Sequence, residues 1–213
     1  MMKKKIKIDL PVLDMPLQPA NFDTLEDEAY YENCVFENCT LENDTFAHVC
    51  FKKVKFINVT FENMSFSQLE LLDVHFEKCD FSNVEFIGAI IHRAYFNGTK
   101  LVGTNFADAT LQHVQFDGIH GKYSSFSYAS MKYVSFTNAL LVQADFFELN
   151  WQQLLFAECD LTGANFMNTS LKGLNLSTCY FEQLMISLDK VAGVSVTTEQ
   201  AIVFAEALQI NIV

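Results

Sequence analysis

Phenylalanine occupies every tenth position from Phe36 to Phe166, fourteen times without a gap. The positions midway between them are nearly all apolar, so an apolar residue recurs every five residues from Tyr31 to Ile186. Neither a helix of period 3.6 nor a strand of period 2 produces this pattern. A fixed short period is typical of a solenoid, in which each unit buries its apolar residue by stacking on copies of itself.

The residues around each apolar centre support this interpretation. Two residues before the centre lies a small or modest side chain, and two residues after it Gly or Asn fills fourteen of thirty-two positions. Gly and Asn tolerate positive φ, so each unit is expected to end in a tight corner. Pro11, Pro16 and Pro19 all precede the repeats, as expected if backbone N–H groups form ladders between coils.

Composition narrows the class of protein. The chain of 213 residues suits one domain, and no apolar run approaches the length of a membrane-spanning helix. The basic start, Met1–Lys7, is not followed by an apolar signal region, and six cysteines then indicate reduced thiols in a cytoplasmic protein. A net charge of −12 argues against direct nucleic-acid binding and favours basic partners.

Several pentads resemble a known repeat: Cys79–Asn83, Ala144–Glu148, Cys159–Gly163 and Ala164–Asn168 are similar to the A(D/N)LxX unit of pentapeptide-repeat proteins. The resemblance implies an all-β fold, a right-handed quadrilateral β-helix with twenty residues per coil and about eight coils. We expect the β-helix over residues 29–190, an N-terminal extension over 1–28, and a capping or dimerisation helix and strand over 191–213.

Folding the chain on a twenty-residue coil places alternate phenylalanines in two ladders that face each other across the core. The stack that contains Phe116 lies opposite the stack that contains Phe126. Gly121 leaves one apolar centre empty, so a dent or bulge is expected in that coil.

The same folding sorts the charges. Lys52, Lys53, Lys55, Arg93, Lys132 and Lys172 fall on one side of the coil. Most acids fall on the opposite side and its corners, and ten of them are candidate partner-binding residues: Glu37, Glu42, Glu62, Glu77, Asp80, Glu85, Asp117, Asp145, Glu158 and Asp160. A carboxylate stripe on a rod would attract a basic DNA-binding groove. An acidic solenoid that merely keeps itself soluble explains the same pattern.

A second candidate contact region is the coil over residues 117–136, whose candidate contacts are Ile119, His120, Tyr123, Tyr128 and Tyr133. Exposed tyrosines at corners can anchor a partner, and they can equally cover neighbouring corners.

The C-terminal region predicts a helix. Thr197–Gln200 reads as a capping box that opens a helix to about Leu208. The helix is apolar almost all round, and the last coil can cover only one side of it. A homodimer through the C-terminal end is therefore expected, with the following contact residues: Ile202, Phe204, Ala205, Leu208, Ile210 and Ile212.

Catalytic chemistry finds no support in the sequence. The five histidines fall in unrelated columns, and no phosphate loop, HExxH or nucleophile elbow is present. Cys39, Cys79, Cys159 and Cys179 share an inward column and are interpreted as core thiols rather than as metal ligands. We expect a protein that is not an enzyme and needs no cofactor or metal.

The C-terminal part refines the resemblance. Asn150–Gly163 and the helix at Glu199–Leu208 resemble the quinolone-resistance (Qnr) proteins and their mycobacterial relative MfpA. That resemblance implies dimeric rods that bind DNA gyrase, and possibly topoisomerase IV, by DNA mimicry; they protect it from fluoroquinolones and inhibit it at high dose. The chain lacks the long loops of several Qnr proteins. The alternative is a pentapeptide-repeat scaffold for another protein partner.

Overall fold

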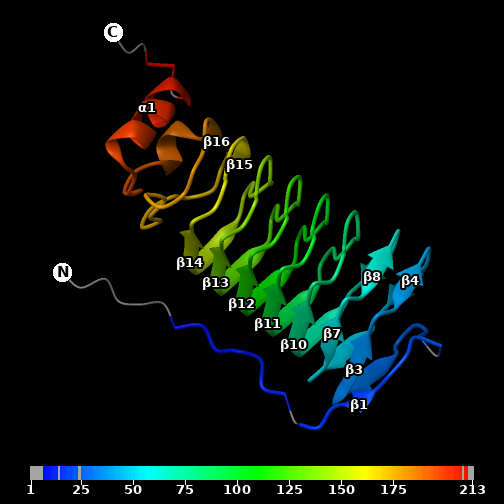
Figure 1. Ribbon diagram of the computed structural model, residues 1–213. Coiled ribbons are helices and arrows are strands. Elements are labelled where there is room, and N and C mark those ends of the chain that lie inside the picture. The colour runs from blue at the N-terminus through cyan, green and yellow to red at the C-terminus, as the bar shows by residue number, and fades with distance from the viewer. Residues whose placement is uncertain (1–6, 14, 24, 208, 211–213) are drawn as a thin grey trace.

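Backbone pairing between residues twenty positions apart builds most of the repeat region. The computed structural model describes residues 7–13, 15–23, 25–207 and 209–210. They form a right-handed, four-sided β-solenoid of about eight turns, followed by one helix at the C-terminal end (Figure 1). The pairs Phe36↔Phe56, Phe76↔Phe96 and Phe136↔Phe156 illustrate the constant offset. The expected fold class is confirmed.

The first coils carry short strands, one on each side of the square. Their bounds are β2 (Tyr30–Glu32), β3 (Cys34–Glu37), β4 (Thr40–Glu42), β5 (Thr45–Ala47), β6 (Cys50–Lys52), β7 (Lys55–Ile57), β8 (Thr60–Glu62) and β9 (Ser65–Ser67).

In later coils, two adjacent sides merge into one longer strand. These strands are β10 (Glu70–Glu77), β11 (Ile90–Asn97), β12 (Thr110–Asp117), β13 (Ser130–Thr137) and β14 (Asn150–Ala157). They form a parallel sheet in the order β10-β11-β12-β13-β14 (Figure 1). The other two sides hold mostly single bridges at the same offset, with β15 (Ala164–Phe166) paired to β16 (Leu184–Ile186) near the end.

The corners are left-handed throughout the regular repeat. Every fifth residue from Glu28 to Gly173 has positive φ. The predicted corner is confirmed, and it accepts far more than Gly and Asn, since Arg93 (φ 52°) and Tyr123 (φ 62°) occupy the same position. A repeated backbone geometry, stabilised by ladders on both sides, therefore overrides the local preference of each residue.

The phenylalanine ladders form the core as expected. Phe116 stacks between Phe96 and Phe136, with ring centroids 4.8 and 4.6 Å away. Phe126 meets Phe116 edge-on across the core, at 5.8 Å and 73°. Stacked contacts along each ladder and edge contacts between ladders are both favourable aromatic geometries.

The expected bulge at Gly121 is absent from the described chain. His120 pairs with Lys100 and with Leu140 at the usual offset, so the coil keeps its register. The space of the missing side chain is taken by its neighbours, since a Cβ added to Gly121 would lie 3.0 Å from Leu141 and 3.3 Å from Ile119. Side-chain repacking, rather than a backbone distortion, compensates for the glycine.

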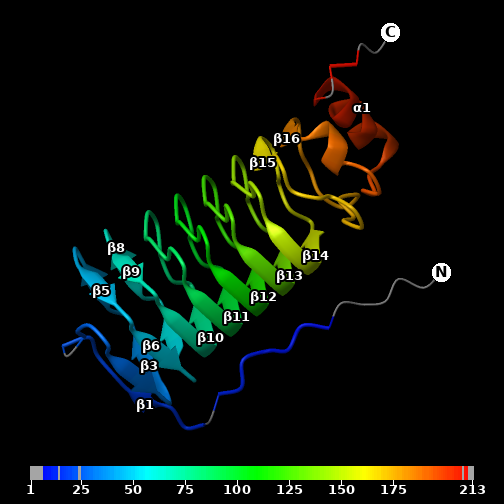
Figure 2. The ribbon, with the colours of Figure 1, turned by 180° about the vertical axis from the view of Figure 1, so that it is seen from behind.

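The N-terminal extension is part of the fold. Strand β1 (Gln18–Pro19) pairs with β3 at an offset of sixteen residues instead of twenty. Phe22 follows it and stacks on Phe36 at 4.2 Å, which closes the first end of the aromatic ladder. Upstream, residues 7–13 run back along the outside of β10–β12 (Figure 2). The extension thus caps one end of the rod and also covers part of one flank.

The helix α1 (Thr198–Ala207) follows a short 3₁₀ turn at Leu188–Lys190. Its capping box is confirmed, because the Gln200 backbone N–H donates to Thr197 Oγ1 (3.2 Å) and the Thr197 N–H donates to Gln200 Oε1 (2.9 Å). The Gln200 side chain also donates to the carbonyls of Leu176 (2.9 Å) and Cys179 (2.7 Å). One residue thus caps the helix and attaches it to the last coil.

Candidate functional site

The ten candidate acids are all at the surface, but to different extents. Glu37, Glu42, Glu62, Glu85 and Glu158 are exposed. The other five are half-buried: Glu77, Asp80, Asp117, Asp145 and Asp160. The exposed acids therefore provide most of the carboxylate surface that a partner could contact.

Glu42 and Glu62 are the most informative of these acids. They lie directly opposite each other in the parallel pairing of β4 with β8, and both side chains are exposed. Like charges placed directly across a ladder are destabilising, and a nearby opposite charge would relieve the repulsion. This pair gives the first half of the rod a concentrated negative surface.

Three of the aspartates also have a structural function that the sequence interpretation missed. Asp80, Asp145 and Asp160 each accept a hydrogen bond from the backbone N–H two residues further on, all at 3.0 Å. A carboxylate in this arrangement forms an Asx turn and stabilises the corner. These three aspartates therefore stabilise the fold, and a role in partner binding would be additional to that.

Two candidate acids are paired with lysines. Lys100 Nζ lies 3.0 Å from Asp80 Oδ2, and Lys55 Nζ lies 2.9 Å from Glu77 Oε2. The placement of Lys55 on the side opposite Glu77 is therefore wrong, because β7 and β10 are neighbours and carry the two residues on one side. Burial alone would raise the pKa of Asp80, but hydrogen bonds from Ser82 and Lys100 outweigh it and lower the pKa.

The candidate contact coil is only partly a surface. Ile119 is fully buried, so its assignment as a contact residue is wrong; it fills the space beside Gly121. His120 is exposed, and Tyr123 and Tyr128 are 52% and 54% exposed. Tyr133 is half-buried and its ring stacks on His113 at 4.8 Å. Tyr123 and Tyr128 remain the accessible aromatic side chains of this coil.

The predicted dimer residues divide similarly. Ile202 and Ile210 are exposed, and Ala205 is half-buried. Phe204 is 8% exposed and packs on Phe181 at 6.1 Å, so it belongs to the cap of its own chain rather than to a free dimer surface. Leu208 and Ile212 lie outside the described residues.

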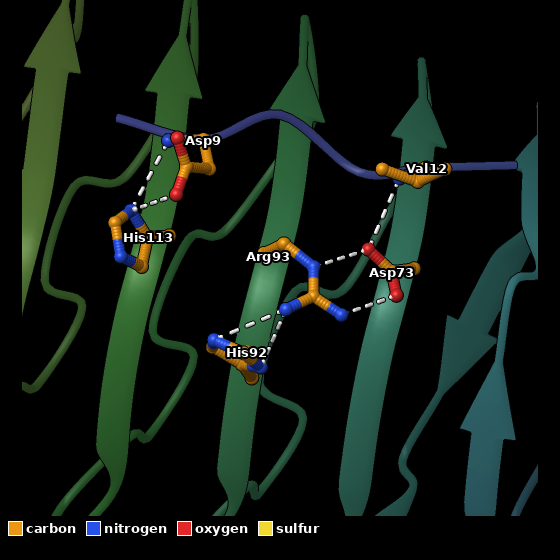
Figure 3. A network of polar contacts seen from close by, with 6 residues as sticks. All are labelled: Asp9, Val12, Asp73, His92, Arg93 and His113. Carbon is orange, nitrogen blue, oxygen red and sulfur yellow. Dashed lines mark hydrogen bonds and ion pairs between the residues drawn. The ribbon is translucent and has the colours of Figure 1, made fainter. Parts of the chain in front are cut away.

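A polar network clamps the N-terminal segment to the flank of the rod (Figure 3). The Val12 N–H donates to Asp73 Oδ1 (3.0 Å), and the Asp9 N–H donates to His113 Nδ1 (3.1 Å). Arg93 lies between them, and Asp73, Arg93 and His113 are stacked corner residues of β10, β11 and β12. Sequence reasoning missed this clamp, although these three ionisable residues stand where Gly and Asn are common.

The clamp shifts the titration of its members. Burial would raise the pKa of Asp73, but hydrogen bonds from Arg93 and Val12 outweigh it and lower the pKa. Burial, with the Arg93 charge, lowers the pKa of His92, which lies beside the guanidinium. At neutral pH the network therefore contains a carboxylate, a guanidinium and a neutral His92.

All six cysteines are free thiols. Burial raises the pKa of Cys34 and of Cys79 to about 11, while the hydrogen bond to Cys179, together with burial, raises the pKa of Cys159. Within the described ranges, no group of three or more His, Cys, Asp or Glu side chains is arranged to hold a metal ion. Nor does that part of the chain contain a helix long and apolar enough to cross a membrane.

Comparisons with known proteins place the repeats in one family. Residues 29–98, 69–146 and 89–166 match the family described as "Pentapeptide repeat region", and residues 152–183 match "Pentapeptide repeats (8 copies)". The uncharacterized protein YisX of Bacillus subtilis (strain 168) is 44% identical over 210 residues, which cover 96% of this chain and 97% of that protein.

Two solved structures are similar to this chain. Full-length QnrB1, a plasmid-mediated fluoroquinolone resistance protein, has a TM-score of 0.48 and 17% identity, over 91% of this chain and 95% of that chain. HetL of the cyanobacterium Nostoc sp. strain PCC 7120, a pentapeptide repeat protein involved in heterocyst differentiation regulation, has a TM-score of 0.33 and 15% identity, over 76% and 88%. Both likenesses concern the fold.

Proposed function

This chain belongs to the pentapeptide-repeat family, and we propose that it is a protein-binding rod whose carboxylates occupy the basic DNA-binding surface of a type II topoisomerase, DNA gyrase above all. Bound there, it would exclude DNA and protect the enzyme from fluoroquinolones, and at high dose it would inhibit supercoiling. The proposed partner follows from the resemblance of residues 150–163 and 199–208 to the Qnr and MfpA proteins.

The observation that best supports this proposal is the exposed Glu42–Glu62 pair. A surface that binds DNA presents lysines and arginines spaced to neutralise phosphates. Carboxylates stacked at the strand spacing of about 4.8 Å present repeated negative charge to such a surface. Binding to a cationic groove would also relieve the repulsion between the two glutamates. The same pair that destabilises the free rod would therefore strengthen the complex.

The experiment reverses charge on this surface. We expect the Glu42→Lys, Glu62→Lys double variant to bind gyrase about tenfold or more weakly near physiological salt, with binding falling further as salt rises. A matched control is Asp108→Lys, Glu148→Lys, which makes the same charge change at exposed corners on another edge of the rod. The readouts are direct binding and gyrase supercoiling with and without ciprofloxacin.

Two results separate the partner from the mechanism. If the unaltered protein neither protects nor inhibits gyrase, the proposed partner is wrong. If the protein does act on gyrase but both double variants behave alike, the partner stands and recognition through this carboxylate surface is refuted.

A second candidate is a scaffold for a different protein, which the exposed Tyr123 and Tyr128 favour. Two adjacent aromatic corners more than half exposed are typical of contact anchors. Replacing both by serine would abolish binding to such a partner and leave a charge-driven gyrase complex unchanged.

A further inference from the structure

The long parallel sheet of the rod ends before the rod does. Strand β14 is the last strand of the sheet, although residues 170–177 lie one period further along. Those residues form no strand, and within the described chain no backbone hydrogen bond joins them to β14. The edge of β14, which is eight residues long, is therefore left without the next strand that pairs with every earlier long strand.

The repeat identifies the backbone groups left at this edge. In an earlier coil, the Lys53 N–H donates to Leu72 O (2.8 Å) and the Val54 carbonyl accepts from His75 (3.0 Å). The equivalent groups in β14 are the Gln153 N–H and the Leu154 carbonyl. Both point toward the next coil, so one donor and one acceptor flank the left-handed corner at Gln153 and can pair with an added segment that bends there as each long strand does.

Trp151 joins β14 to the coil that follows it. Its indole Nε1–H donates to the Ser170 carbonyl at 2.8 Å. On another side of the solenoid, the residue equivalent to Ser170 accepts from a backbone amide, as His120 does from Leu101 (2.8 Å). In the last coil the Trp151 indole, rather than a backbone amide of β14, donates to this carbonyl.

An open groove of about 380 Å³ lies at this point, lined by Trp151, Gln152, Gln153, Ser170 and Lys172 among others. Gln152, Gln153 and Lys172 are exposed. Natural sheets protect exposed edges with charged residues, prolines or bulges, yet β14 contains no charged residue and no proline. The edge has the properties of a docking strand rather than of a protected one.

The positive charge near the groove favours an acidic segment over a second copy of the chain. Lys172 lines it, Lys132 pairs in register with Gln152, and none of the lining residues is acidic. In a chain of net charge −12 this is a locally basic site. An acidic segment is attracted to it, whereas a second copy joined edge to edge would bring the lysines of both chains together.

We propose that the β14 edge binds an extended, acidic segment of a protein partner by strand addition, with a side chain of that segment against Trp151 and its carboxylates near Lys132 and Lys172. This site is on a different face from the Glu42–Glu62 pair and does not depend on the topoisomerase proposal. The backbone of β14 would supply pairing, and the two lysines would supply the preference for acidic sequences.

The test uses the full chain and a blocked synthetic peptide of alternating glutamate and valine, seven residues long, followed by ¹⁵N–¹H spectra. We expect saturable shifts at the Gln153 amide and the Trp151 indole, with slower amide exchange at Gln153. The same peptide with lysine in place of glutamate should not bind. Lys132→Glu, Lys172→Glu should weaken binding at least tenfold, while the matched control Lys78→Glu, Lys122→Glu, also at exposed positions, should not.

Three outcomes would overturn the proposal. One is the absence of any shift at β14 up to millimolar peptide, and another is equal binding of the acidic and basic peptides. The third is a dimer in sedimentation whose formation alone protects the Gln153 amide, because the occupant would then be a second copy of the chain.

Discussion

Arg93 donates two parallel hydrogen bonds to the Asp73 carboxylate, from Nε to Oδ1 and from Nη2 to Oδ2, both 2.6 Å long. The Asp73 side chain is only 5% exposed, because the N-terminal segment lies over it and donates the Val12 N–H to the same carboxylate. One ion pair therefore joins two neighbouring coils, and its carboxylate also holds Val12, which lies 61 residues upstream in the chain.

Removing Arg93 should be costly. Arg93→Ala leaves the Asp73 carboxylate buried without its counter-charge, and we expect a loss of about 3 kcal/mol in the free energy of unfolding. Urea titration measures the loss, and faster amide exchange at Val12 would show that the N-terminal segment is released. Lys132→Ala, at an exposed position, is the control and should change stability by less than about 0.5 kcal/mol. A similar small change in Arg93→Ala would contradict this account.

The same pair makes stability depend on pH. Because the folded-state pKa of Asp73 is lowered, its contribution is present above the ordinary carboxyl pKa of about 4 and is lost as pH falls through the lower folded-state pKa. Stability measured from pH 6 to pH 2 should therefore fall at the acid end. In Arg93→Ala, burial is no longer opposed by the guanidinium, so the gap between variant and parent should narrow in acid. A gap independent of pH would exclude this linkage.

The facing aromatic ladders predict a large cost for a central truncation. Phe116 is fully buried, with stacked neighbours on both sides and Phe126 across the core. Phe116→Ala should cost about 3–5 kcal/mol. Phe147→Ala, at a half-buried position beside the corner at Glu148, is the matched control and should cost far less. Comparable losses at both positions would mean that the ladder does not carry the core.

Much of this was foreseeable from the sequence, for a physical reason. A five-residue period repeats one local environment, so the ladders, the corners and the capping box at Thr197–Gln200 follow from pattern alone. The clamp at Asp73, Arg93 and His113 does not, because it depends on a segment with no period of its own. The burial of Ile119 does follow from the period, because it lies two residues before the centre at Gly121, in the inward position that Thr99 and Ala139 fill in the neighbouring coils.

Left-handed corners predict an unusual order of substitutions at Gly118. Its φ is +61°, and a Cβ added there would meet nothing within 4 Å, so only backbone strain opposes a side chain. Gly118→Asn should be nearly neutral, Gly118→Ala should cost about 1 kcal/mol, and Gly118→Val should cost more. Thermal unfolding of the three variants gives the order directly. A stabilising Gly118→Val would show that strain at this corner is negligible.

The helix attachment depends on Gln200. Gln200→Ala removes the capping partner of Thr197 and leaves the carbonyls of Leu176 and Cys179 without their donors. We expect a loss of about 2–3 kcal/mol in the stability of the C-terminal cap, with earlier melting of the helical circular dichroism signal. Thr198→Ala, at an exposed position, is the control. Unchanged helix melting in Gln200→Ala would show that the side chain is not the anchor.

The constant offset of twenty residues also limits how such a chain can change length. Removing or adding five residues rotates everything downstream by a quarter turn, so a column of carboxylates would continue on a different side of the rod while the core stayed filled. Removing or adding twenty restores every column and changes only the length. Surface patterns in this architecture are therefore inherited in whole turns, and a single lost pentad would redraw the binding faces without unfolding the protein.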